Sequence, residues 1–258
     1  MGAGANFVVF DGTIYKNKPD LSSYGIKPIY LINANTLWKK GQNINDLPDV
    51  SLVREAARTA RSNGKIAIID IEHWKLTGEE TTVNESVAKY ATVLQWFHDA
   101  APEVLVGYYG LPPIRDYWRA IKGPDAPQYI VWQAENDRLK PIIDKVNILF
   151  PSLYTYYVDR DGWIKHAIAN IKEARRYLGN KPIYVFLWPQ YHNSNSSLTL
   201  KYLPPDYWRL ELEIARQYAD GVVIWAGWDF DKNAKAQWND DAPWWQVTKK
   251  FVEEVRHQ

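Results

Sequence analysis

The chain has 258 residues, and its 31 basic and 30 acidic side chains leave a formal net charge of +1. This balance, without any run of Lys or Arg, argues against a nucleic-acid partner. Cysteine is absent, which excludes disulfides and thiolate metal ligands. No apolar stretch approaches the length of a membrane-spanning helix, so we expect no membrane partner. Residues 1–5 lack a secretory pattern and are expected to be disordered or derived from an expression tag.

Seven short apolar runs follow one another along the chain and read as strands. They lie at residues 7–10, 26–34, 65–72, 104–109, 146–154, 181–188 and 221–228. Most are too apolar for a half-exposed strand, which is typical of parallel strands covered by helices. Amphipathic segments separate them and read as helices at residues 49–64, 84–102, 161–180, 204–220 and 243–258.

Strands that alternate with helices predict an α/β fold, either a closed barrel or an open doubly wound sheet. No glycine-rich phosphate motif follows any strand, which disfavours a nucleotide-binding sheet. We therefore predict a TIM-type (β/α) barrel of seven or eight parallel strands, regular or distorted. The absence of a linker or repeat predicts one catalytic domain over residues 1–258.

The run "IAIIDIEHW" (66–74) ends in two acids, Asp70 and Glu72. Alternate residues of a strand share a face, so both carboxyls point the same way, with Cα atoms roughly 6.5 Å apart. At the C-terminal end of a barrel strand they would lie where barrel enzymes place their chemistry. Two close carboxyls in a partly dry site raise one pKa and supply a proton donor. The alternative is structural, because acids at strand ends also cap helices or form ion pairs.

Aromatic residues with a polar edge are abundant, with 13 Trp and 17 Tyr against 7 Phe. Such rings suit sugars, which have apolar C–H faces and hydroxyl rims, although large cores also use them. Several follow strand ends, and alternation lets only one of Tyr108 and Tyr109 face inward. The residues expected to contact substrate are Trp74, Tyr108, Tyr109, Tyr154, Trp188, Trp225, Trp228 and Asp229. The long polar loop 189–205 is expected to form a cleft wall.

Four segments together, in chain order, resemble the hyaluronidase family of glycoside hydrolases. They are "IAIIDIEHW", "VGYYGLP" (106–112), "LFPSLY" (149–154) and "GVVIWAGWD" (221–229). The resemblance implies a barrel that retains configuration at the anomeric carbon by substrate-assisted catalysis, in which the sugar's acetamido oxygen is the nucleophile.

The resemblance also implies a role for each matching residue. Glu72 would be the general acid and later the general base, and Asp70 would orient and stabilise the acetamido group. Tyr109 and Tyr154 would hydrogen-bond around that group, and Trp225 would form a wall of the site for the −1 sugar. No cofactor or metal is implied, and the five histidines form no metal-ligand pair.

The chain also departs from that family, and other functions stay open. It has no Cys, Ile71 replaces the usual Trp between the acids, and no basic groove for a polyanion is evident. The mechanism is therefore expected to transfer better than the substrate. The alternatives are a lysozyme-like barrel acting on peptidoglycan and a barrel that binds glycan without cleaving it. Length and lack of Cys favour a bacterial or phage source and an extracellular, cell-surface or phage-associated setting.

Overall fold

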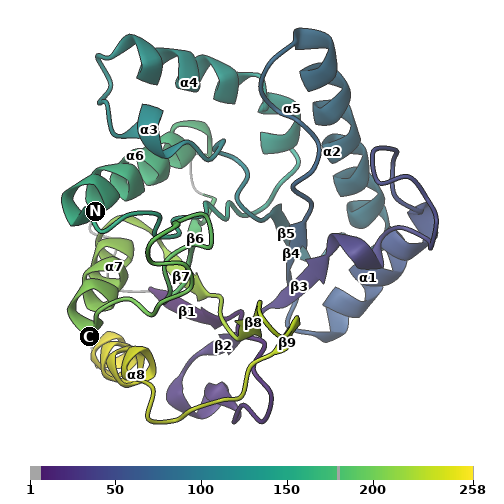
Figure 1. The fold of residues 1–258 in the computed structure, drawn as a ribbon. Coiled ribbons are helices and arrows are strands. Elements are labelled where there is room, and N and C mark those ends of the chain that lie inside the picture. The colour runs from purple at the N-terminus through teal and green to yellow at the C-terminus, as the bar shows by residue number, and fades with distance from the viewer. Residues whose placement is uncertain (1–6, 179–180, 258) are drawn as a thin grey trace. The chain divides into compact units, whose positions relative to one another are not determined.

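The computed structural model describes residues 7–178 and 181–257, which fall into two compact units (Figure 1). Unit 1 comprises Met1–Pro28, Ser152–Ile171 and Pro182–Gln258, and unit 2 comprises Ile29–Pro151 and Lys172–Lys181. Helix α6 (Arg160–Leu178) runs from the first into the second. The expectation for residues 1–5 lies outside the described part of the chain.

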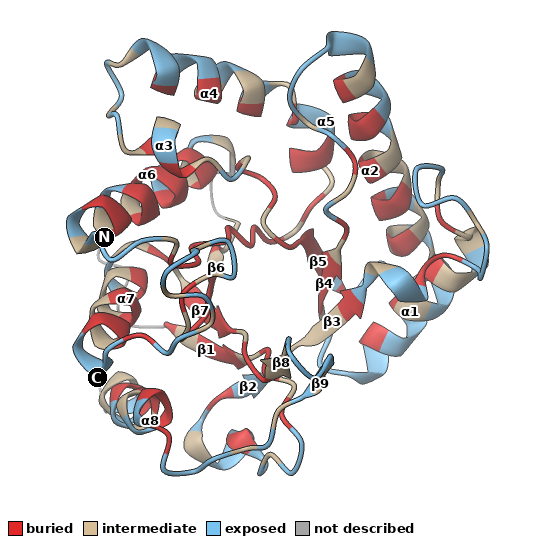
Figure 2. Cartoon of the chain, viewed as in Figure 1, coloured by how far each residue is buried: buried red, intermediate tan, exposed pale blue. Residues whose placement is uncertain are grey.

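Unit 1 is built on a parallel sheet with the strand order β2-β1-β7-β6. These strands are β1 (Val8–Asp11), β2 (Lys27–Pro28), β6 (Tyr184–Leu187) and β7 (Gly221–Ile224). The unit also holds helices α7 (Pro205–Tyr218) and α8 (Pro243–Arg256), the short helix η1 (Leu21–Tyr24), and the antiparallel pair β8 (Trp228–Asp229) and β9 (Ala234–Lys235). Strand β7 is buried throughout, as its apolar sequence requires (Figure 2).

Unit 2 contains a second parallel sheet with the order β3-β4-β5. Its strands are β3 (Tyr30–Asn33), β4 (Ile66–Asp70) and β5 (Leu105–Tyr108). Its helices are η2 (Ala34–Thr36), α1 (Val50–Ser62), α2 (Glu80–Ala100), α3 (Tyr117–Ala120), α4 (Pro127–Asp137) and α5 (Lys140–Ile143). Helix α1 packs against α2. Asp49 caps α1 by accepting hydrogen bonds from the backbone N–H groups of Ser51 and Leu52, at 2.8 and 3.3 Å.

The expected strands and helices are largely present, with two informative differences. The run 26–34 is divided into β2 and β3, and the run 146–154 makes only isolated bridges, Phe150 with Tyr109 in unit 2 and Ser152 with Phe186 in unit 1. Pro151 explains the second difference, because proline has no N–H to donate to a sheet. Helix α2 begins four residues before the expected start at Asn84. Among the described residues, no helix is long and apolar enough to cross a membrane.

Candidate active site

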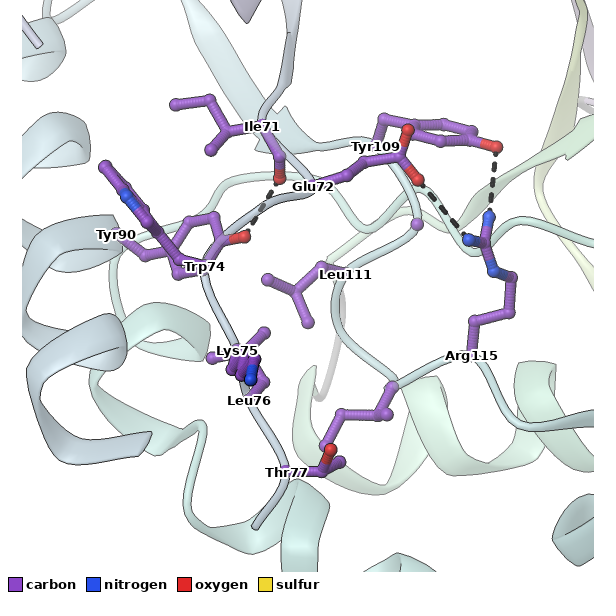
Figure 3. A pocket seen from close by; sticks show the side chains of 12 residues that line it. Ile71, Glu72, Trp74, Lys75, Leu76, Thr77, Tyr90, Tyr109, Leu111 and Arg115 are labelled. Carbon is purple, nitrogen blue, oxygen red and sulfur yellow. Dashed lines mark hydrogen bonds and ion pairs between the residues drawn. The ribbon is translucent and has the colours of Figure 1, made fainter. Parts of the chain in front are cut away.

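A cavity of about 220 Å³ lies at the C-terminal ends of β4 and β5 in unit 2 (Figure 3). We call it the acid pocket. The residues of its lining that the argument uses are Glu72, Trp74, Lys75, Tyr90, Tyr109 and Arg115. The position agrees with the expectation that strand ends gather the chemistry of an α/β enzyme.

The two acids reach this end of the sheet because of the alternation of β4. Ile69 and Ile71 are each 1% exposed, so they belong to the core. Asp70 is the last residue of β4 and pairs with Asn33 of β3. Glu72 lies beyond the strand, lines the acid pocket and has a side chain that is 51% exposed. The isoleucines are thus buried and Glu72 is exposed to the acid pocket, whereas Asp70 lies outside the lining and Ile71 contributes to it.

Burial, followed by the negative charge of Glu72, raises the pKa of Asp70 to about 6, while the positive charge of Arg115 opposes the change. The sequence predicts a raised pKa for one carboxyl of the pair without choosing which one. The raised group is Asp70, whereas the resemblance gives the acid role to Glu72. The site therefore contains one carboxyl that changes charge near neutral pH and a second, more exposed one two residues away.

Arg115 is a member of this site that the sequence did not indicate. Its Nη2 lies 3.4 Å from Oε2 of Glu72, and its Nη1 donates to the hydroxyl of Tyr109 over 3.5 Å (Figure 3). It follows the Gly/Pro turn after β5, where a lone basic residue carries no recognisable signal. The guanidinium is therefore placed to orient both a carboxylate and a phenol in the acid pocket.

Tyr108 does not contact the acid pocket, and its expected role in binding substrate is corrected here. Its side chain is 0% exposed, and its hydroxyl donates to the carbonyl of Tyr90 over 2.8 Å. Tyr109, the next residue, has the opposite orientation and lines the pocket. The hydroxyl of Tyr90 donates in turn to the carbonyl of Ile71 over 2.9 Å. Tyr90, on α2, thus fixes the backbone that carries the acids.

Four predicted aromatics, Tyr154, Trp188, Trp225 and Trp228, lie in unit 1. Trp188 packs against Tyr154 and Trp225 with ring centroids 5.4 and 4.8 Å apart. Trp188 is 2% exposed and its indole N–H donates to Gln190, so it supports Trp225 rather than offering a face to a sugar. Trp225 is half-buried. Trp228 and Asp229 line another cavity of this unit, of about 250 Å³.

Trp74 retains the position that was expected for it. It lines the acid pocket, packs edge-on against Tyr90 at 4.9 Å and donates its indole N–H to the carbonyl of Ile44 over 3.2 Å. Within residues 7–178 and 181–257 no cluster of three His, Asp or Glu side chains is arranged to hold a metal ion.

This fold, with acids at the ends of parallel strands, is of the (β/α)-barrel class found in glycoside hydrolases. A glycoside hydrolase family 5 enzyme from Prevotella bryantii B14 matches over 97% of both chains at 11% identity, with a TM-score of 0.54. Bee venom hyaluronidase matches over 98% of both chains at 14% identity, with a TM-score of 0.65. The same enzyme in complex with a hyaluronic acid tetramer matches with a TM-score of 0.61 at 14% identity, over 98% of this chain and 97% of that one.

The sequence supports the same relationship. A hyaluronidase from Polybia paulista is 27% identical over 171 residues, which are 62% of this chain and 58% of that protein. The chain thus matches less than two thirds of the length of its curated relative. No protein-family model matches the chain. The predicted barrel fold is confirmed, and the chain is hyaluronidase-like in fold and in sequence.

Proposed function

We propose that the protein is a glycoside hydrolase that cleaves a β-linked polysaccharide containing N-acetylhexosamine, with retention of configuration. The observation that carries this proposal is Glu72, which lines the acid pocket with Tyr109 and Arg115 and follows Asp70, the last residue of β4, by two positions. The hyaluronidase-like sequence and fold supply independent support.

The nucleophile in this proposal is the acetamido oxygen of the substrate. A protein nucleophile in a retaining enzyme lies across the sugar from the acid, with the two carboxyls ~5–5.5 Å apart on opposite sides of the scissile bond. Asp70 and Glu72 instead both come from the C-terminal end of one strand, Asp70 as its last residue and Glu72 two residues later. The acetamido oxygen bonds to the anomeric carbon while Glu72 transfers its proton to the departing glycosidic oxygen. Water then attacks the anomeric carbon of the cyclic intermediate and gives a proton to Glu72, while the bond between that carbon and the acetamido oxygen breaks and the acetamide is restored.

Asp70 has a charge-dependent role in this scheme. Its carboxylate accepts a hydrogen bond from the acetamido N–H and stabilises the positive charge that develops on that group. Both effects require Asp70 to be ionised. Because its pKa is raised to about 6, it becomes ionised only as the pH passes that value. In this proposal the Tyr109 hydroxyl, which accepts a hydrogen bond from Arg115, donates to the reacting acetamido group.

Tyr154 and Trp225 keep the roles that the hyaluronidase resemblance implies, as predictions. The same holds for the bacterial or phage source and for the extracellular setting. Hyaluronic acid is a candidate substrate because bee venom hyaluronidase has been crystallised with a tetramer of it. Neutral polymers of N-acetylhexosamine are equally candidates, since the resemblance covers the mechanism more closely than the substrate.

The test is a panel of β-linked N-acetylated glycans, with the anomer of the first product followed by proton NMR. An initial β-anomer, and a large loss of rate on a matched substrate without the acetyl group, support the proposal. An initial α-anomer contradicts it. Glu72→Gln is expected to lower kcat by ~10²–10⁴-fold while sugar binding persists. Glu85→Gln, an exposed acid on α2, is the matched control and is expected to retain full activity.

A barrel that only binds glycan would show no turnover with any member of the panel. A lysozyme-like enzyme would instead turn over peptidoglycan in preference to the other glycans. These two outcomes separate the alternatives from the proposed reaction.

A further inference from the structure

The cavity of unit 1 that contains Trp228 and Asp229 has the chemistry of a sugar site. We call it the aromatic pocket; it measures about 250 Å³. The lining residues that carry the argument are Tyr15, Tyr202, Trp228, Asp229, Phe230 and Asp231. None of them belongs to the acid pocket, and both cavities are described wholly within their own units.

Two of its rings are exposed to an unusual degree for aromatic side chains. Tyr202 is 50% exposed and Phe230 is 39% exposed. Phe230 also packs against Trp188, with ring centroids 6.0 Å apart, so it has a supported position. Exposed rings inside a cavity offer flat apolar faces, which match the C–H face of a pyranose ring.

The backbone around the aromatic pocket is shaped to bring these groups together. Gly227 has φ 102°, and a Cβ added there would lie 2.7 Å from the backbone nitrogen of Tyr15. A glycine is therefore required for Tyr15 to lie in the lining. The hydroxyls of Tyr15 and Tyr202 are 3.4 Å apart. Residues Gln190 and Leu200 line the same cavity, so the loop 189–205 forms a wall, as expected from its length.

The charges of the two cavities are opposite in character. The lining of the acid pocket includes the cations Lys75 and Arg115 beside Glu72. Among the described residues, the charged side chains in the lining of the aromatic pocket are Asp229 and Asp231, and Asp229 is paired with Lys232 at 2.9 Å. Carboxylates accept hydrogen bonds from sugar hydroxyls, whereas a uronate or sulfate here would face the like charge of Asp231, since the ion pair of Lys232 is with Asp229.

We propose that the aromatic pocket is a second carbohydrate-binding site, which takes an uncharged pyranose ring stacked on Phe230 or Tyr202 with its hydroxyls donating to Asp229 and Asp231. The class of ligand rests on the proposed function, but the binding does not require hydrolysis. The site would bind a neutral sugar unit of the polysaccharide and bind a charged unit more weakly.

The test uses the complete chain with Glu72→Gln, ¹⁵N-labelled at its tryptophan indoles. Trp228 reports on the aromatic pocket and Trp74 on the acid pocket. The neutral probe is N,N′-diacetylchitobiose, and the charged probe is a disaccharide of glucuronate and N-acetylglucosamine. We expect the Trp228 resonance to shift and saturate with the neutral probe, and to respond at least fivefold more weakly to the charged one.

Variants assign the effect to the aromatic pocket. Phe230→Ala is expected to lower the affinity for the neutral probe, as measured at Trp228, by roughly tenfold, because one stacking face is lost. Trp118→Ala removes an exposed ring of unit 2 and is expected to leave this titration unchanged. Asp231→Asn, an exposed replacement that does not depend on core packing, is expected to reduce the discrimination between the two probes.

The outcomes separate this inference from the proposed function. A Trp228 signal that stays constant while Trp74 responds overturns the second site and leaves the proposed function standing. The inference is also overturned if the affinity read at Trp228 is the same with and without Phe230→Ala, or if it is higher for the charged probe than for the neutral one. If neither the Trp228 nor the Trp74 resonance shifts at millimolar sugar, the result contradicts both the second site and the proposed function.

Discussion

Asp70→Asn is expected to make the protein more stable at neutral pH while it removes activity. Burial and the charge of Glu72 raise the pKa of Asp70 from its ordinary value of 3.8 to about 6. Below pH 3.8 the folded and unfolded chains both hold this proton, so the raised pKa costs nothing. Between these two values unfolding releases the proton, and the free energy of unfolding falls by about 1.4 kcal/mol for each pH unit. The cost reaches about 3 kcal/mol above pH 6 and then stays constant.

The assay is urea denaturation of the wild-type chain and of Asp70→Asn from pH 4 to pH 8. Asn has nearly the same shape and no charge to desolvate, so the difference in free energy of unfolding should be small at pH 4. It should grow to about 3 kcal/mol in favour of the variant at pH 7. Asp125→Asn, at an exposed turn, is the matched control and should follow the wild type. Parallel pH profiles for Asp70→Asn and wild type, or a less stable variant at pH 7, would refute the reasoning.

Three further predictions concern the same unit. Glu72→Gln should lower the pKa of Asp70, because the charge of Glu72 helps to raise it, and a ¹³C carboxyl titration by NMR measures that pKa directly. Arg115→Met should raise the pKa of Asp70 above about 6 and move the acidic limb of the kcat/KM profile to higher pH; an unmoved limb would show that Asp70 does not control it. Gly107→Ala should destabilise the chain by ~1–3 kcal/mol, because its Cβ would lie 2.2 Å from the carbonyl oxygen of Ile148, and unchanged thermal unfolding would contradict this.

The acid pair was predictable because its signal is local. Alternation along a strand predicts that Asp70 and Glu72 face away from Ile69 and Ile71. This prediction needs only the four residues themselves and no knowledge of how the strand packs. The same rule shows that only one of two adjacent tyrosines faces the site, but it cannot choose between them. That choice depends on which hydroxyl finds a partner in the core.

Other features depend on contacts between segments that lie far apart in the sequence. Arg115 reaches Glu72 across 43 positions, and the packing of a loop rather than any pattern near Arg115 brings them together. Helices α3 and α5 have four residues each, too few to show a helical period. The aromatic pocket depends on Gly227, whose requirement for a positive φ becomes evident only once Tyr15 lies beside it.

A comparison of two strand-end acids bears on whether Asp70 is merely structural. Asp11 ends β1 and accepts hydrogen bonds from the backbone and the hydroxyl of Thr13, at 2.9 and 2.6 Å, and from Lys18 at 2.6 Å. Asp70 ends β4 in the same way, yet none of the described residues donates a hydrogen bond to its carboxylate, and its charge is disfavoured by burial and by Glu72.

A structural carboxylate is expected to resemble Asp11, because partners offset the cost of its burial. Asp70 instead costs a substantial part of the ~5–15 kcal/mol that keeps a domain folded. A group held at such cost, two residues from an acid that lines a pocket, has the environment of a catalytic carboxyl. Increased stability of Asp70→Asn with loss of turnover would therefore exclude the structural explanation, since a capping or ion-paired acid loses stability when its charge is removed.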